Sequence, residues 1–193
     1  MKNIFILVFI FYFPSIALSE NFKFKKITSL DNPWGSSFIN NEEIIITEKS
    51  GKIKIVNIST NESIQVQHNL NFLEHGQGGL LDILYKDNFI WISYSEKRGN
   101  QKTSTSIARA NLDKKKLSFK NIFQSTPPIN SGYHFGSRLA IKDNYLFAST
   151  GERGKGMIAQ DASKHPGSII RIHLDGSIPK DNPRFEGKSK WLP

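Results

Sequence analysis

The chain has 193 residues, enough for one domain with a substantial core, and its content of 38% hydrophobic and 22% charged residues excludes an intrinsically disordered protein. It contains no cysteine, which excludes disulfide bonds and thiolate metal sites. The formal net charge of +9 allows anionic partners, but the lysines are scattered except for Lys114-Lys115-Lys116. We interpret this triplet as a solvated hairpin tip in preference to a nucleic-acid patch, and we expect no nucleic-acid partner.

The N-terminal residues have the pattern of a cleavable secretory signal. Lys2 supplies a positive charge, residues 4–16 are almost wholly apolar, and Ala17-Leu18-Ser19 provides small residues where signal peptidase cleaves. A retained membrane anchor is the alternative, but the apolar run is shorter than the roughly 20 residues that a spanning helix needs. We therefore assign residues 1–19 to a signal peptide cut near Ser19. The expected location is periplasmic or secreted, with no stable membrane insertion after cleavage.

Short strand-like runs bounded by turn residues follow along the chain, and helical periodicity is nearly absent. Residues 43–47 and 52–56 predict a hairpin around the turn at residues 48–51. The further predicted strands are residues 89–94, 104–110, 145–150 and 168–174, the last closed by the turn Asp175-Gly176-Ser177. This pattern predicts an all-β fold.

Three glycine-containing segments divide the predicted strands into repeats. They are Trp34-Gly35, Gly79-Leu80-Leu81 and Gly136-Ser137-Arg138-Leu139, and they lie about 45 to 55 residues apart, which is typical of propeller blades. A β-sandwich also has short strands and turns, but a glycine turn at the start of each interval favours a propeller. Three blades do not close a ring of about four to eight. We therefore expect residues 20–193 to form a partial β-propeller that is incomplete at its C-terminus.

Four residues near glycines are candidates for chemistry. His134 could accept a proton near neutral pH, or it could simply pack among its aromatic neighbours. Arg138 could bind a carboxylate or pair with a nearby acid. Glu152 could orient a base or lie solvated in a turn, and Gln77 offers an amide in a glycine-rich loop. From the residues alone, these alternatives stay open.

Other candidate sites are weaker. The glycine-rich loop lacks the Gly-Lys-Ser/Thr step of a phosphate-binding loop. Asp161 and His165 are too isolated to predict a metal site, and we assign no residue of the chain as a metal ligand.

Six motifs, taken in order, resemble one known family. The segments are "NPWGSSF", "GQGGLLDI", "HFGSRLAI", "STGERG", "AQDASKHPGSIIRI" and "DGSIPKDNP". Between Asn32 and Pro193 they resemble the soluble aldose sugar dehydrogenases that depend on pyrroloquinoline quinone (PQQ), also called the glucose/sorbosone dehydrogenase family. The resemblance implies a six-bladed β-propeller of which about three blades are present here.

The resemblance also implies an activity and roles for the four candidates. Members of the family oxidise aldose sugars at the anomeric carbon to lactones, with PQQ and calcium, and pass electrons to a periplasmic acceptor. By motif, His134 matches the general base and Glu152 the acidic residue that assists it. Gln77 matches an amide near the quinone and the sugar, and Arg138 matches the arginine of the histidine motif. We assign Gln77 and Arg138 to cofactor binding, with a more structural role for Arg138.

The chain also departs from the family pattern. An "RNPQG"-type segment and later Lys and Arg residues, which hold the cofactor and help to build the calcium site, are not present in residues 1–193. Tyr133 stands where Gly or Asp often precedes the histidine, which is expected to alter sugar selectivity. We therefore expect this polypeptide alone to be inactive. A non-catalytic propeller fragment or binding module is the alternative, and a lactone hydrolase is less favoured because no cluster of metal-binding acids is evident.

Overall fold

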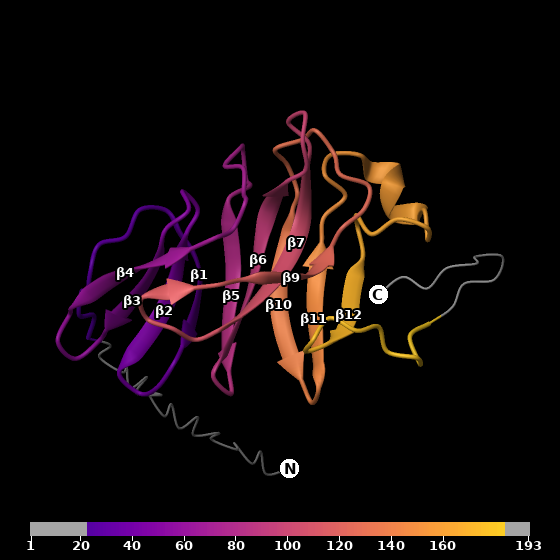
Figure 1. Ribbon diagram of the computed structural model, residues 1–193. Coiled ribbons are helices and arrows are strands. Elements are labelled where there is room, and N and C mark those ends of the chain that lie inside the picture. The colour runs from indigo at the N-terminus through magenta and orange to yellow at the C-terminus, as the bar shows by residue number, and fades with distance from the viewer. Residues whose placement is uncertain (1–22, 184–193) are drawn as a thin grey trace, which may run out of the picture.

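The computed structural model describes residues 23–183, and the regular structure in them is almost entirely β-strand (Figure 1). The predicted signal peptide, residues 1–19, lies outside the described residues, as does the end of the predicted propeller region, residues 184–193. A single 3-10 helix, Gly156–Gln160, is the one helical element among the described residues. In the described part of the chain, no helix is long and apolar enough to cross a membrane.

The strands form three sheets, which we call blades 1 to 3. Blade 1 consists of β1 (Pro33–Phe38), β2 (Glu43–Glu48), β3 (Ile53–Asn57) and β4 (Ser63–His68). Blade 2 consists of β5 (Leu80–Lys86), β6 (Phe89–Lys97), β7 (Thr103–Asn111) and β9 (Lys120–Gln124). Blade 3 consists of β10 (Gly136–Lys142), β11 (Tyr145–Thr150) and β12 (Ile169–His173).

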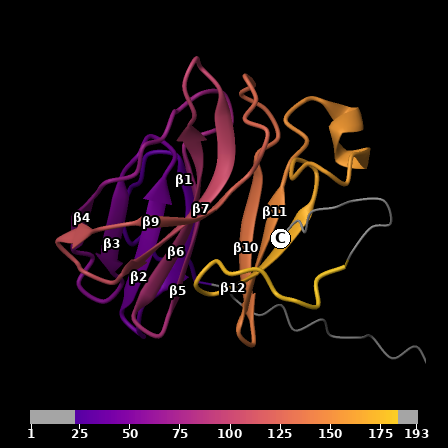
Figure 2. The same cartoon turned by 45° about the vertical axis from the view of Figure 1, so that its right-hand side comes forward.

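The blades follow one another in chain order, and Figures 1 and 2 show them as successive layers with blade 2 in the middle. Within each blade, consecutive strands pair antiparallel. The innermost strands β1, β5 and β10 begin at or next to the three glycine segments that marked the repeats. The predicted all-β fold, a partial β-propeller of about three blades, is confirmed.

One connection differs from the prediction. After β7 the chain does not turn back at once into a hairpin, because Lys116–Leu117 forms a short strand, β8, that pairs parallel with β4 of blade 1. The Lys114 ammonium lies 2.6 Å from a carboxylate oxygen of Glu43. The three lysines are exposed, as expected, in the connection between the antiparallel strands β7 and β9, but this connection also links blade 2 to blade 1.

Strand alternation explains why blade 2 is buried on both faces. In β6, Ile90, Ile92 and Tyr94 belong to the core shared with blade 1, whereas Trp91 belongs to the core shared with blade 3. Successive side chains of a strand point to opposite faces, so both sets are buried where a neighbouring blade covers each face. Burial of each such side chain contributes about 1.5–3 kcal/mol. The two cores hold the blades in a fixed order and thereby fix the loops at their ends.

Candidate active site

The candidate base lies in a loop that enters the innermost strand of blade 3. Residues 131–135 precede β10, and residues 151–154 follow β11. Since Gly136 pairs with Thr150 across these antiparallel strands, the loop and the turn meet at the same end of the blade, the upper end in Figure 1. The β10–β11 hairpin thus brings residues 131–135 next to residues 151–154.

A close approach of the backbone holds this loop against the turn. A Cβ atom added to Gly151 would lie 1.9 Å from the carbonyl oxygen of His134. The Gly151 N–H donates to the carbonyl oxygen of Phe135 at 3.1 Å. Only glycine fits at position 151, because any side chain would collide with the backbone that carries the histidine.

His134 and Glu152 are hydrogen-bonded to one another through the imidazole Nδ1 and the carboxylate Oε1. The histidine side chain is 54% exposed and the glutamate side chain 27% exposed. His134 has a φ of 47°, in the left-handed region that costs a non-glycine residue energy and that clusters at functional sites. The structure therefore brings together the two side chains that the motifs predicted as base and helper, and their roles stay predictions.

The charge state of Glu152 sets the tautomer of the histidine. The hydrogen bond from His134 holds the pKa of the Glu152 carboxyl below its usual range, and the backbone N–H of Gly154, 3.1 Å from Oε1, acts in the same direction. Glu152 is therefore a carboxylate at neutral pH and can only accept a hydrogen bond. In a neutral imidazole, Nδ1 of His134 therefore carries the proton that is donated to Glu152, and Nε2 has a lone pair that can accept another.

Gln77 fixes the same loop from blade 2. Its side-chain Oε1 accepts a hydrogen bond from the backbone N–H of His134 at 2.8 Å, and its own backbone N–H donates to the carbonyl oxygen of Gly132 at 2.7 Å. The Gln77 amide oxygen is thus committed to the loop. Its exposed amide group keeps a nitrogen that can donate to a bound ligand.

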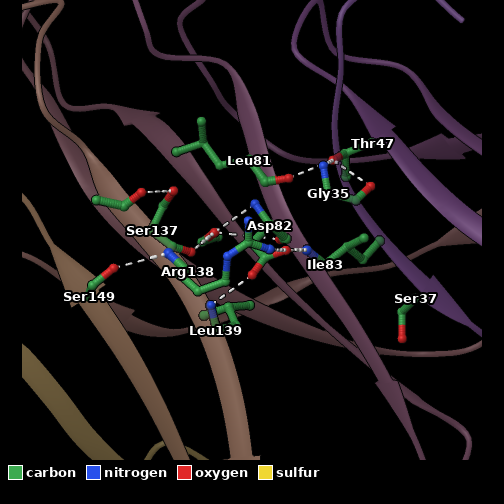
Figure 3. A network of polar contacts seen from close by, with 12 residues as sticks. Gly35, Ser37, Thr47, Leu81, Asp82, Ile83, Ser137, Arg138, Leu139 and Ser149 are labelled. Carbon is green, nitrogen blue, oxygen red and sulfur yellow. Dashed lines mark hydrogen bonds and ion pairs between the residues drawn. The ribbon is translucent and has the colours of Figure 1, made fainter. Parts of the chain in front are cut away.

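Arg138 lies apart from these three residues, on β10, and is paired with a buried carboxylate (Figure 3). Its Nη1 is 3.0 Å from Oδ1 of Asp82, whose side chain is only 2% exposed, whereas the Arg138 side chain is 68% exposed. The guanidinium also lies over the Trp34 ring, 5.5 Å from its centroid. Among the described residues, no hydrogen bond joins Arg138 to His134, Glu152 or Gln77.

Asp82, which lies within strand β5, was not singled out from the sequence. Its Oδ2 accepts the backbone N–H of Leu139 at 2.8 Å, and its Oδ1 accepts that of Ile83 at 3.1 Å (Figure 3). The Ser93 hydroxyl donates to the carbonyl oxygen of Ser137 at 2.7 Å and accepts the Asp82 N–H at 3.0 Å. The sequence signal that could have identified it is an acidic residue between apolar residues of a strand, here Leu81 and Ile83.

The donors present fit an anionic cofactor only in part. The exposed guanidinium of Arg138 keeps donors beyond the one given to Asp82, and Gln77 keeps its amide nitrogen, so both can bind a carboxylate or a carbonyl group. Within residues 23–183, no group of three or more His, Asp or Glu side chains could hold a metal ion.

Known proteins are similar to most of this chain. The family model described as glucose/sorbosone dehydrogenase matches residues 30–191. Aldose sugar dehydrogenase YliI of Escherichia coli (strain K12) is 34% identical over 164 residues, covering 80% of this chain and 44% of that protein. The crystal structure of the soluble aldose sugar dehydrogenase of Escherichia coli in its apo form matches with a TM-score of 0.76 and 32% identity, over 82% of this chain and 48% of that one.

A further solved structure shares the fold. The PQQ-bound form of the aldose sugar dehydrogenase of Streptomyces coelicolor has a TM-score of 0.71 and 24% identity, over 83% of this chain and 49% of that one. The chain spans less than half the length of the curated relatives it matches.

Proposed function

The chain belongs to the glucose/sorbosone dehydrogenase family, and we propose that it supplies the base-carrying half of a quinone-dependent aldose dehydrogenase. The observation that carries this proposal is the His134–Glu152 pair, exposed at the end of blade 3 and held there by Gln77. The reaction is oxidation of an aldose at its anomeric carbon to the lactone, and the electrons then pass to a periplasmic acceptor.

His134 is proposed as the general base. Its Nε2 takes the proton of the anomeric hydroxyl as the C–H bond breaks and the C=O bond of the lactone forms. Glu152 accepts a hydrogen bond from Nδ1–H throughout, which orients the ring and stabilises the imidazolium that forms, the same logic as in hydrolytic triads. When bound, PQQ supplies the acceptor for the hydride that leaves the carbon.

Gln77 and Arg138 are proposed to contact the cofactor or sugar from this half. Gln77 does so with its amide nitrogen, since its oxygen is bound to the loop. Arg138, whose guanidinium is held by its ion pair with Asp82, is proposed to bind a carboxylate of the cofactor. Calcium is proposed for the family activity, but none of the described residues is proposed as its ligand.

Tyr133 is proposed to bound the sugar next to the base. The residue is 62% exposed, and its ring centroid lies 6.2 Å from that of His134. An aromatic face with a hydroxyl at its edge suits a sugar, which presents both C–H and O–H groups.

The test uses a full-length protein that contains these residues, as distinct from the polypeptide of residues 1–193 alone. It is reconstituted with PQQ and calcium and assayed for dye-linked glucose oxidation. His134→Ala is expected to lower kcat/KM by about 100-fold or more, since a general base contributes on that order. His173→Ala is the matched control, because this histidine pairs with Tyr145 where β11 begins and contacts none of the site residues. Equal turnover in wild type and His134→Ala would sink the assignment of the base.

Two finer proposals follow from the sequence. A polypeptide of residues 1–193 alone is proposed to show no quinone-dependent sugar oxidation, and turnover by that purified polypeptide with PQQ and calcium would refute this. The protein is also proposed to be exported, with its mature N-terminus at Glu20. Intact mass measurement of the protein from a periplasmic extract tests export, and a protein that keeps Met1 contradicts it.

A further inference from the structure

A buried arginine underlies the loop that carries the proposed base. Arg153 directly follows Glu152, and it is only 2% exposed although it carries a guanidinium. Burial lowers its pKa to about 10, which leaves it charged at neutral pH. A buried charge is costly unless it is paired or fully hydrogen-bonded. No carboxylate forms an ion pair with Arg153 among the described residues, so its hydrogen bonds must account for its presence there.

Those hydrogen bonds connect two separate parts of the chain. Toward the loop, Arg153 Nε donates to the carbonyl oxygen of Tyr133 at 2.9 Å, and Nη2 donates to that of Ser131. Toward blade 2, Nη1 donates to the carbonyl oxygen of Thr103 at 3.1 Å, and Nη2 donates to the Thr103 hydroxyl at 2.8 Å. The guanidinium also stacks on the Phe135 ring, 3.6 Å from its centroid. A single side chain thus holds the loop at both sides of Gly132.

The anchor at the other end is rigid. Thr103 is the first residue of β7 and exchanges two backbone hydrogen bonds of 3.0 Å with Ile129. Arg153 itself has a φ of 60°, so its backbone, like that of His134, is held in the left-handed region. An apolar side chain could fill this space, but it could not bind three carbonyl oxygens at once. The planar fork of an arginine does so from three separate nitrogens, whereas a lysine presents all its donors on one nitrogen and cannot span the same acceptors.

We propose that Arg153 is a positioning residue: its buried guanidinium fixes residues 131–135 so that His134 meets Glu152. The role as a positioner of the loop stands on the contacts alone, whereas its effect on catalysis rests on the proposed function. No local pattern singles out this residue, because its partners lie 20 to 50 positions away in the chain.

The first test is hydrogen exchange on the chain itself, without cofactor or sugar. In Arg153→Lys, the His134 amide, which donates to Gln77, is expected to exchange about tenfold faster than in wild type, while the Ile107 amide in β7 is unchanged. The matched control is Arg109→Lys, since Arg109 also stacks 3.6 Å over a phenylalanine ring but lies near the other end of β7. Unchanged exchange at His134, or equal acceleration at every amide, would overturn the proposal.

A second variant guards against failure to fold. Arg153→Met keeps the volume and removes the buried charge, and the same local acceleration at His134 is expected from it. A second readout is the pKa of the Glu152 carboxyl, measured by carbon NMR. It is expected to rise toward its ordinary value in Arg153→Lys, which retains the positive charge, because the hydrogen bond from His134 is lost. A pKa of Glu152 that stays low in that variant would contradict the proposal.

Kinetics then separate this inference from the proposed function. In the gene product reconstituted with PQQ and calcium, Arg153→Lys is expected to lower kcat about 10- to 100-fold with little change in KM, as misplacement of a base would. If the wild type has no activity, the proposed function fails, and the exchange experiment still decides the role of Arg153. If the wild type is active and kcat is unchanged in Arg153→Lys, the catalytic part of the inference is wrong.

Discussion

Two regions join blade 2 to blade 3, and they are built in opposite ways. Between the strands, the buried carboxylate of Asp82 accepts backbone N–H groups from both blades (Figure 3). At the end of the blades, the His134–Glu152 pair is partly exposed and its backbone is held by Gln77. The buried region contributes stability through satisfied hydrogen bonds, whereas the exposed region keeps a titratable nitrogen open to a ligand. Their difference predicts that stability and activity respond to different substitutions.

The largest expected effect on stability is at Asp82. Asp82→Ala leaves the buried N–H of Leu139 without its acceptor and is expected to lower the free energy of unfolding by on the order of 3 kcal/mol. Urea denaturation followed by circular dichroism measures this. Glu152→Ala is the comparison, with an expected change within about 0.5 kcal/mol because that carboxylate lies at the surface. Equal losses in the two variants would remove the distinction between the regions.

The next largest effect on stability is expected at Gly151, whose backbone packs against that of His134. Gly151→Ala places a methyl group against the carbonyl oxygen of His134 and is expected to cost about 2 kcal/mol, in the range of overpacked sites. Gly156→Ala is the control, since a Cβ there has nothing within 4 Å and the change is expected to be neutral. If Gly151→Ala is as stable as wild type, residues 131–135 do not pack against Gly151 as closely as described.

A smaller effect is expected at Arg138. Its side chain is mostly exposed, so Arg138→Met is expected to cost less than about 1 kcal/mol although it breaks the ion pair with Asp82. A loss as large as that of Asp82→Ala, in the same urea measurement, would mean that the ion pair and not the Leu139 N–H is what Asp82 contributes.

The smallest effect is a pH dependence from Glu152. Its pKa is lowered by folding, so its contribution is present above the unfolded pKa near 4.5 and is lost as the pH falls through the lower folded value. Wild type and Glu152→Gln are therefore expected to differ in unfolding midpoint at neutral pH and to converge in acid. A difference that grows as the pH falls below about 4.5 would reverse the sign and contradict the lowered pKa of Glu152.

Local patterns predicted much of the fold, and contacts distant in sequence account for the rest. The hairpin at residues 43–57 and the glycine turns before β5 and β10 follow from period-two alternation and turn residues. The parallel pairing of β8 with β4 rests on two residues and leaves no periodic signal. The pairing of His134 with Glu152 was expected from motifs, but the anchors Asp82 and Arg153 were not, because the groups that they bind across the two blades are 20 to 57 positions away.

The central claim is that His134, oriented by Glu152, takes a proton in the oxidation of an aldose. The pH dependence of kcat/KM for glucose, measured on the gene product with PQQ and calcium, tests it most directly. We predict that wild-type kcat/KM has the acid limb typical of a reaction that needs an unprotonated base, and that His134→Ala is about 100-fold slower and lacks this limb. An unchanged acid limb or an unchanged rate in His134→Ala would contradict the claim.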